Sequence, residues 1–167
     1  ANGYVRAEGC ASLALKATAE PNVCTLAGVG SNQDGKSANL TSPNGIAQQA
    51  VIRMALHGML SPKSSESHGT GTALGDPIEA SAIAATLLVA RDQGVALPVG
   101  SVKANVGHTE SASGMVGLSK LLSAVRCTRA APNAQLTVGA ALVGAAWDTA
   151  PSACALPTQL AQGAWGA

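Results

Sequence analysis

The stretch spanning residues 66–80, ESHGTGTALGDPIEA, most constrains how this chain can fold. A histidine, His68, precedes two Gly-Thr pairs, and an Asp-Pro pair then opens a run typical of a helix start. We expect Asp76 to be the N-cap and Glu79 to complete a capping box. The pattern therefore predicts a helix over Pro77–Ala90, with proline at its first position, behind a loop that holds a titratable imidazole.

That loop carries hydroxyls at Thr70 and Thr72, and glycines that let a ligand or another backbone come close. A similar stretch, SVKANVGHTESASG, follows at residues 101–114 and contains Lys103 and His108. Two neutral imidazoles can donate N–H bonds to an oxygen that gains negative charge, and a lysine can assist them. From the residues alone the alternative stays equally open that each histidine is a structural residue in a Gly-rich loop.

The composition predicts that a large face of the chain is buried against other protein. Hydrophobic residues make up 47% of the 167 residues and charged residues 11%, which supplies a core but few charges for a free-standing surface. A net charge of +1 gives no electrostatic support for a nucleic-acid or membrane partner, and no apolar run reaches membrane-spanning length. The four cysteines form no C-x-x-C pair, which favours a reduced, intracellular setting without a metal site.

The remaining periodicity predicts an α/β layered fold, because strands alternate with helices. The expected strands are Cys10–Lys16, Val23–Val29 and Leu97–Val102. The expected helices are residues 46–58, capped by Ser42, and Ser111–Arg126. The polar segment before the first histidine specifies its strand weakly, and the chain beyond Cys127 predicts no clear element.

Residues 30–37, GSNQDGKS, match the phosphate-binding pattern G-x-x-x-x-G-K-S letter for letter. A loop of that kind must open directly into a helix whose N-terminus faces the phosphates. Residues 38–43, ANLTSP, are instead a poor helix start that ends in proline. We therefore interpret the stretch as a Gly/Asn-rich loop, with ATP or GTP binding as the minor alternative.

Two longer segments, HGTGTALGDPIE at 68–79 and GSVKANVGHTE at 100–110, resemble the two histidine motifs of β-ketoacyl synthase domains. Three more segments match the same family in order: GYVRAEGC at 3–10, NQDGKS at 32–37 and TSPNG at 41–45. Five ordered motifs make chance similarity negligible. The match covers residues 1–126 of a partial domain and leaves 127–167 as a poorly matched tail. The Gly-Thr-Gly-Thr form resembles type I, modular polyketide synthases.

The resemblance implies the thiolase-like fold, an α/β/α/β/α layered sandwich that works as a homodimer. This chain would be mainly its C-terminal half, truncated at both ends. The implied activity is acyl transfer by decarboxylative Claisen condensation of an acyl thioester with malonyl-acyl carrier protein, in polyketide or fatty-acid biosynthesis. No cofactor is expected to bind directly. The phosphopantetheine arm of the acyl carrier protein carries the substrate, and the carrier protein and other synthase domains are the expected partners.

Carried over by motif, His68 and His108 are the expected catalytic histidines and Lys103 is the supporting lysine. Thr70 and Thr72 are the expected contacts to the pantetheine arm. The family's nucleophilic cysteine belongs to a Thr-Ala-Cys-Ser motif upstream, which this chain lacks. We therefore expect the chain alone to be inactive.

A second reading stays open, in which the parent is a non-condensing thiolase-fold partner subunit or a carrier-protein-binding module. The resemblance also implies a cytoplasmic setting, with an organelle such as a plastid as the alternative.

Overall fold

In a computed structural model, the described residues are 3–20, 24–35, 42–58, 62–89, 96–134, 136, 141–147, 154–157 and 161–162. The centre of the molecule is a parallel sheet in the order β1-β2-β4. Its strands are β1 (Ser65–Glu66), β2 (Leu97–Gly100) and β4 (Cys154–Ala155). A second, antiparallel pair joins β3 (Arg129–Ala130) to β5 (Ala161–Gln162). The neighbouring strands of this sheet are parallel and are separated by helices in the chain, which confirms the predicted α/β class.

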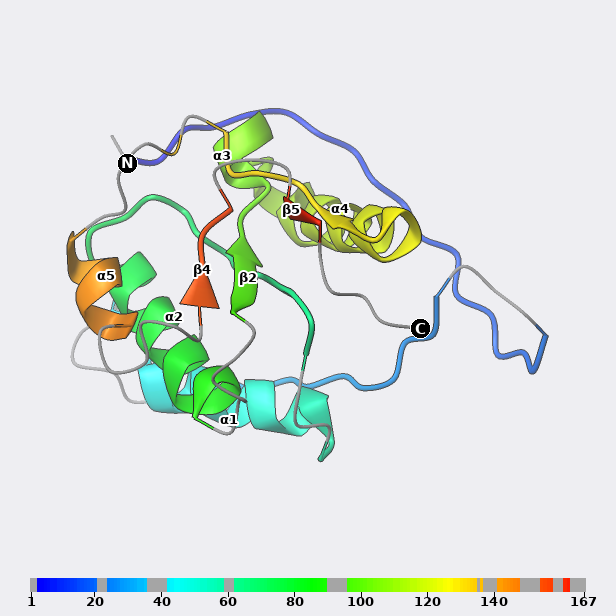
Figure 1. Ribbon diagram of the computed structural model, residues 1–167, viewed down its shortest axis with the longest axis horizontal. Coiled ribbons are helices and arrows are strands. Elements are labelled where there is room, and N and C mark those ends of the chain that lie inside the picture. The colour runs from blue at the N-terminus through cyan, green and yellow to red at the C-terminus, as the bar shows by residue number, and fades with distance from the viewer. Residues whose placement is uncertain are drawn as a thin grey trace.

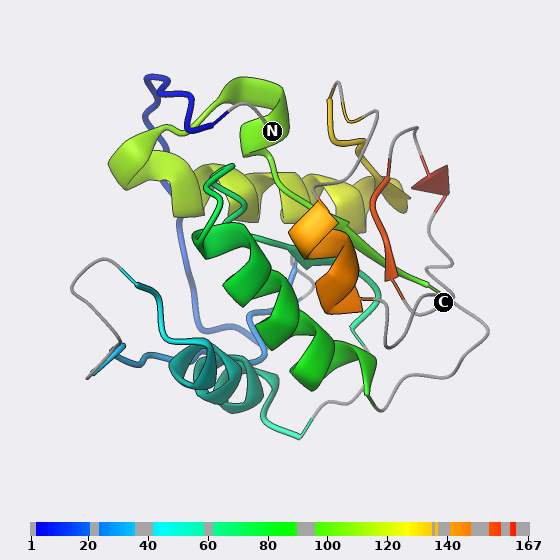
Figure 2. The ribbon, with the colours of Figure 1, turned by 90° about the vertical axis from the view of Figure 1, so that its left-hand side faces the viewer.

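Helices cover both faces of the parallel sheet (Figures 1 and 2). One face carries α1 (Gly45–Leu56), α5 (Ala141–Trp147) and α2 (Gly75–Ile83), which continues as a π-helical stretch, η1 (Ala84–Leu88). The other face carries α4 (Ser113–Cys127). The short helix α3 (Lys103–Val106) and the 3-10 turn η2 (Glu110–Ala112) connect β2 to α4. This arrangement leaves the connection after β2 at one end of the sheet.

The core lies between α2, η1 and β2. Its buried members are small and aliphatic: Ile83, Ala84, Leu87, Leu88, Leu97 and Val99. Leu97 is fully buried, and Trp147 of α5 packs against the cluster from the tail. Burying each Leu or Val side chain contributes roughly 1.5–3 kcal/mol, so this cluster holds β2 and the loop after it in place.

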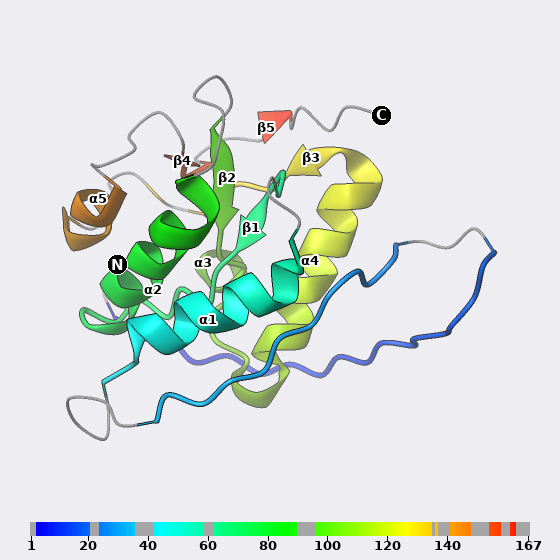
Figure 3. The same ribbon diagram turned by 90° about the horizontal axis from the view of Figure 1, so that it is seen from below.

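Two predicted strands are wrong. Residues 10–16 and 24–29 run as single extended segments outside the helices, with no strand partner, and residue 23 lies outside the described part (Figure 3). Their apolar side chains point into solvent, with Leu15 78% and Val29 69% exposed. Alternating residues favour a strand only where a neighbouring strand completes the ladder, and here neither segment finds one.

The predicted helix over 46–58 is confirmed as α1, but its cap is Asn44 and not Ser42. The Asn44 side-chain oxygen accepts from the backbone N–H groups of Ile46 at 3.0 Å and Ala47 at 3.2 Å. The helix ends at His57, in the left-handed conformation with φ 46°. Asparagine is as strong an N-cap as serine, and it stands one residue before the helix.

The predicted start of the second helix is also wrong in detail. It begins at Gly75 after Leu74, which makes no side-chain cap bond. Thr72 Oγ1 accepts from the Gly75 N–H at 3.1 Å and so satisfies the first free donor of the helix. Asp76 and Glu79, expected to cap the helix, instead turn their carboxylates toward the preceding loop.

Other predictions agree with the structure within two residues. The strand expected over 97–102 ends at residue 100, and the helix expected over 111–126 is η2 followed by α4. The tail after Cys127, for which the sequence predicted no clear element, contributes β3, α5, β4 and β5. Residues 30–35 of the phosphate-like pattern have no regular structure, whereas its last two residues, 36 and 37, lie outside the described part. No helix among the described residues is long and apolar enough to cross a membrane.

Candidate active site

The two predicted histidines lie at the same end of the sheet. His68 lies two residues after the end of β1, and His108 follows β2 through α3. Because β1 and β2 are parallel neighbours, their carboxyl ends meet at one edge, where ligand sites of α/β proteins form. The two imidazole rings lie 5.3 Å apart between centroids and are nearly perpendicular, at 85°. The structure therefore brings together two residues that are 40 positions apart in the chain.

Two carboxylates of α2 hold the His68 loop. Glu79 accepts backbone N–H bonds from His68 at 2.5 Å and from Gly69 at 2.8 Å. Asp76 accepts from the Gly71 N–H through both oxygens, each at 3.1 Å. Gly69 and Gly71 have φ of 47° and 81°, which glycine adopts without steric cost. The pairing fixes the backbone at the first histidine, so these acidic residues position the site and do not cap the helix.

The second histidine is buried and bonded on both sides of its backbone. His108 N donates to Val5 O at 2.7 Å, and Ala7 N donates to His108 O at 2.9 Å, which forms a parallel bridge to the N-terminal segment. Glu110 N donates to His108 Nδ1 at 2.9 Å. A backbone amide keeps its proton, so Nδ1 is the acceptor and neutral His108 carries its proton on Nε2. The ring therefore offers an N–H donor from its far nitrogen.

Residues that sequence reasoning missed surround His108. The Tyr4 ring lies 4.6 Å from the His108 ring at a tilt of 37°. Arg6 Nε lies 3.3 Å from Glu110 Oε1. Glu110 itself has a positive φ of 50°, a conformation that costs a non-glycine residue about 1–3 kcal/mol. These contacts join the segment at 3–8 to the loop after β2. The matched motif at 3–10 was the signal that could have pointed to them.

Hydrogen bonds also tie the two histidine loops to each other. Ser101 Oγ donates to the carbonyls of His68 at 3.3 Å and Gly69 at 3.4 Å. Ser101 N donates in turn to the buried side chain of Asn133 at 2.8 Å. Asn133 lies beyond α4, in the region for which the sequence predicted no element. The relative placement of the loops thus depends on a residue that no local pattern identifies.

Burial and neighbouring charges shift the pKa values of several groups at the site. Partial burial lowers the pKa of His68, and the charge of Lys103 and the nearness of His108 lower it further. Burial also lowers the pKa of Lys103, against the opposing attraction of Glu79 and Glu66. Burial raises the pKa of Glu79, although its two backbone hydrogen bonds pull the other way. His68 is therefore a neutral imidazole at physiological pH.

The two predicted threonines stand beside His68. Thr70 Oγ1 and Thr72 Oγ1 lie 3.2 Å apart, and Thr70 Oγ1 also donates to Asp76 at 3.4 Å. Both line an open cavity of about 830 Å³ that includes His68 and Glu79. Its other walls are apolar side chains of α1, α2 and η1, including Val51, Ile52, Ile83 and Leu87. Such a cavity can hold an extended chain with a polar end at His68.

The described residues contain no group of three or more His, Cys, Asp or Glu side chains placed to hold a metal ion. A neutral imidazole at His68, a Nε2–H at His108 and the nearby charge of Lys103 can together stabilise an oxygen that becomes negative.

Fold and site together define an α/β domain with paired histidines at the carboxyl end of a parallel sheet. Residues 23–137 match the family model described as beta-ketoacyl synthase, C-terminal domain. The chain belongs to this family, as the motifs predicted.

Relatives of known name agree. A highly reducing polyketide synthase from Dothideomycetidae sp. (strain 11243) is 44% identical over 130 residues, 72% of this chain and 5% of that protein. The erythronolide synthase EryA3 of Saccharopolyspora erythraea is 44% identical over 136 residues, 75% of this chain and 4% of that protein. The chain thus spans about one twentieth of the length of the curated relatives it matches. The similarity to polyketide synthases confirms the type predicted from the Gly-Thr-Gly-Thr motif.

Solved structures confirm the thiolase-like fold, mainly in its C-terminal half. The oxazolomycin ketosynthase domain OzmH KS7 of Streptomyces albus JA3453 superposes with a TM-score of 0.75 at 31% identity, covering 84% of this chain and 24% of that one. The ketosynthase from module 6 of the bacillaene synthase of Bacillus subtilis 168 gives a TM-score of 0.73 at 31% identity, covering 85% of this chain and 25% of that one.

Proposed function

We propose that this chain supplies the two-histidine half of a β-ketoacyl synthase in a polyketide synthase. The reaction is the decarboxylative condensation of an acyl thioester with a malonyl unit on an acyl carrier protein. One observation carries the proposal: His68 and His108 lie 5.3 Å apart, with the proton of His108 assigned to Nε2. The pKa of His68 is also lowered, by burial and by nearby positive charge, so this ring can donate while neutral.

In the first step the bond between the malonyl carboxylate and its α-carbon breaks, and carbon dioxide leaves. The electron pair moves onto the thioester oxygen as an enolate, which accepts hydrogen bonds from His108 Nε2–H and from a ring N–H of His68. The enolate carbon then attacks the acyl thioester of a cysteine in the full-length protein, and the cysteine thiolate leaves. Preorganised groups supply this stabilisation, because Glu79 holds the backbone of His68 and the Glu110 N–H holds the His108 ring.

Thr70 and Thr72 contact the phosphopantetheine arm of the carrier protein in this proposal. Their hydroxyls border the same open cavity as His68, and an arm along that cavity presents amides for them to bond. The carrier protein, a second copy of the domain and neighbouring synthase domains are the partners, in a cytoplasmic enzyme. Residues 1–167 form one partial domain of that assembly.

The test uses the full-length protein, purified with its carrier modified by phosphopantetheine. We expect a β-ketoacyl thioester after incubation with an acyl donor and malonyl-loaded carrier protein, detected by mass spectrometry. Binding of the carrier without release of carbon dioxide or formation of product would favour the alternative of a non-condensing partner subunit.

Lys103→Met shifts the pH dependence of this reaction. The positive charge of Lys103 is one of the causes that lower the pKa of His68, so removing it raises that pKa toward the ordinary value. His68 acts in its neutral form, so protonation of its ring limits the decarboxylation rate at acidic pH. Because the variant has the higher His68 pKa, this acidic limb of the pH profile moves to higher pH. The measurement is the pH profile of carbon dioxide release in the variant and the parent. An unchanged or downward-shifted acidic limb would contradict this electrostatic role.

A further inference from the structure

We infer that Glu66 is a positioning residue for the reaction proposed above. Its buried carboxylate, which also pairs with Lys120, accepts a backbone hydrogen bond that sets the segment carrying Lys103 and His108 relative to His68. The inference rests on the proposed function. Glu66 lies in β1, two residues before His68, on a part of the strand that the mechanism does not use.

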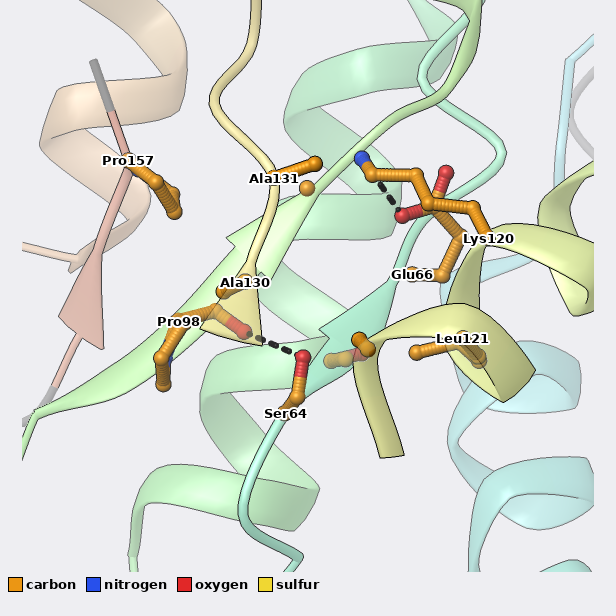
Figure 4. A pocket seen from close by; sticks show the side chains of 11 residues that line it. Ser64, Glu66, Pro98, Lys120, Leu121, Ala130, Ala131 and Pro157 are labelled. Carbon is orange, nitrogen blue, oxygen red and sulfur yellow. Dashed lines mark hydrogen bonds and ion pairs between the residues drawn. The ribbon is translucent and has the colours of Figure 1, made fainter. Parts of the chain in front are cut away.

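The ion pair is buried between β1 and α4. Lys120 Nζ lies 2.9 Å from Glu66 Oε2, with the two side chains 13% and 7% exposed (Figure 4). In the described part of the chain, Nζ makes no hydrogen bond of good geometry. Glu66 is therefore the counter-ion on which the buried charge of Lys120 depends. Through this pair, β1 is fixed to α4, the helix that follows the His108 loop.

The other oxygen of the same carboxylate reaches the connection after β2. Glu66 Oε1 accepts a hydrogen bond from the backbone N–H of Val102. Val102 is the residue before α3, and Lys103 opens that helix. One carboxylate thus joins three elements: the strand that ends in the first histidine, the turn that presents the lysine, and the helix behind the second histidine.

Two glycines make room for the pair. A Cβ atom at Gly100 would lie 2.7 Å from Lys120 Nζ and 3.2 Å from Glu66 Oε2. A Cβ at Gly117 of α4 would lie 3.4 Å from Glu66 Cγ. The carboxylate therefore sits close against both neighbouring elements, and a movement of Glu66 has to move β2 or α4 with it.

Stability alone does not explain the ion pair. Replacing both members of a buried pair by apolar residues is often neutral or stabilising, whereas removing one leaves an uncompensated charge. The Val102 N–H requires a hydrogen-bond acceptor whether or not the ion pair is present, because a buried donor without an acceptor is unfavourable. The charge of Glu66 and its acceptor for Val102 can therefore be removed separately, and only the second should affect the placement of Lys103.

The experiment compares two double variants of the full-length synthase, Glu66→Gln/Lys120→Met and Glu66→Leu/Lys120→Met. Both remove both charges, but only glutamine keeps an acceptor for the Val102 N–H. We expect Glu66→Gln/Lys120→Met to release carbon dioxide from malonyl carrier protein within about threefold of the parent. We expect a loss of about 10²-fold in Glu66→Leu/Lys120→Met, since a displacement of about 1 Å has that effect on catalysis. Acylation of the cysteine should survive in both.

A third variant tests the inference in case Glu66→Leu/Lys120→Met does not fold. Val102→Pro removes the donor and keeps both charges, and the φ of −59° at this position suits proline; its ring carbon takes the place of the amide hydrogen and so displaces the Glu66 carboxylate from Val102. We expect it to lose decarboxylation while keeping acylation. Equal decarboxylation in all variants would overturn the inference, as would a parallel loss of acylation and decarboxylation, which marks a purely structural role. A parent that releases no carbon dioxide would instead refute the proposed function.

Discussion

In the full-length synthase, His108→Ala lowers the rate of malonyl decarboxylation by about 10²–10³-fold, the usual effect of removing one donor to a developing oxyanion. His68→Ala has an effect of the same order, because the enolate oxygen needs both rings. Acylation of the nucleophilic cysteine survives better in both variants, since a thiolate requires only a lowered pKa to attack a thioester. Release of labelled carbon dioxide and mass spectrometry of the acyl-enzyme measure the two steps separately.

The third histidine of the chain provides the matched control. His57 ends α1 in the left-handed conformation, exposed to solvent. Asparagine tolerates that backbone, so His57→Asn should leave both steps unchanged. Decarboxylation at the parent rate in either His68→Ala or His108→Ala would remove that histidine from the proposed role.

The sequence singled out His68 and His108, and the structure places them together for a physical reason. Each motif follows a strand, and neighbouring parallel strands end at the same edge of a sheet. The helices were predicted where the residues that start and end them lie within the segment itself. In α1, the capping residue and the end signal both lie within the segment itself, so only the identity of the cap, Asn44, was mistaken.

The contacts that hold the site could not be predicted, because their partners are distant in the chain. In the sequence, the position of Glu79 near the expected helix start is typical of a capping residue. In the structure its carboxylate instead accepts from the backbone N–H groups of His68 and Gly69. Ser101 depends on Asn133, 32 residues away. Glu66 reads as one polar residue in a weak strand, yet it links β1, α3 and α4.

The isolated 167-residue chain should lack a cooperative thermal transition. Its accessible surface is 10651 Å², whereas a compact monomer of its 16.4 kDa mass exposes about 7,500 Å². The excess is apolar in part, since Leu15, Val29 and Ile46 lie open to solvent. At about 25 cal/mol per Å², uncovered apolar surface of about 400 Å² corresponds to about 10 kcal/mol, comparable to the net stability of a domain.

The tail covers part of the apolar surface that would otherwise be exposed. Trp147 of α5 packs on the core, and its indole N–H donates to Ala80 O at 3.1 Å. Within the described part of the chain, the single extended segments at 10–16 and 24–29 still pair with no strand. We therefore expect the isolated chain to bind a hydrophobic dye strongly and to melt without a sharp transition in calorimetry, as a molten state does. A monomer that binds no dye and melts cooperatively would show that the tail covers the apolar face by itself.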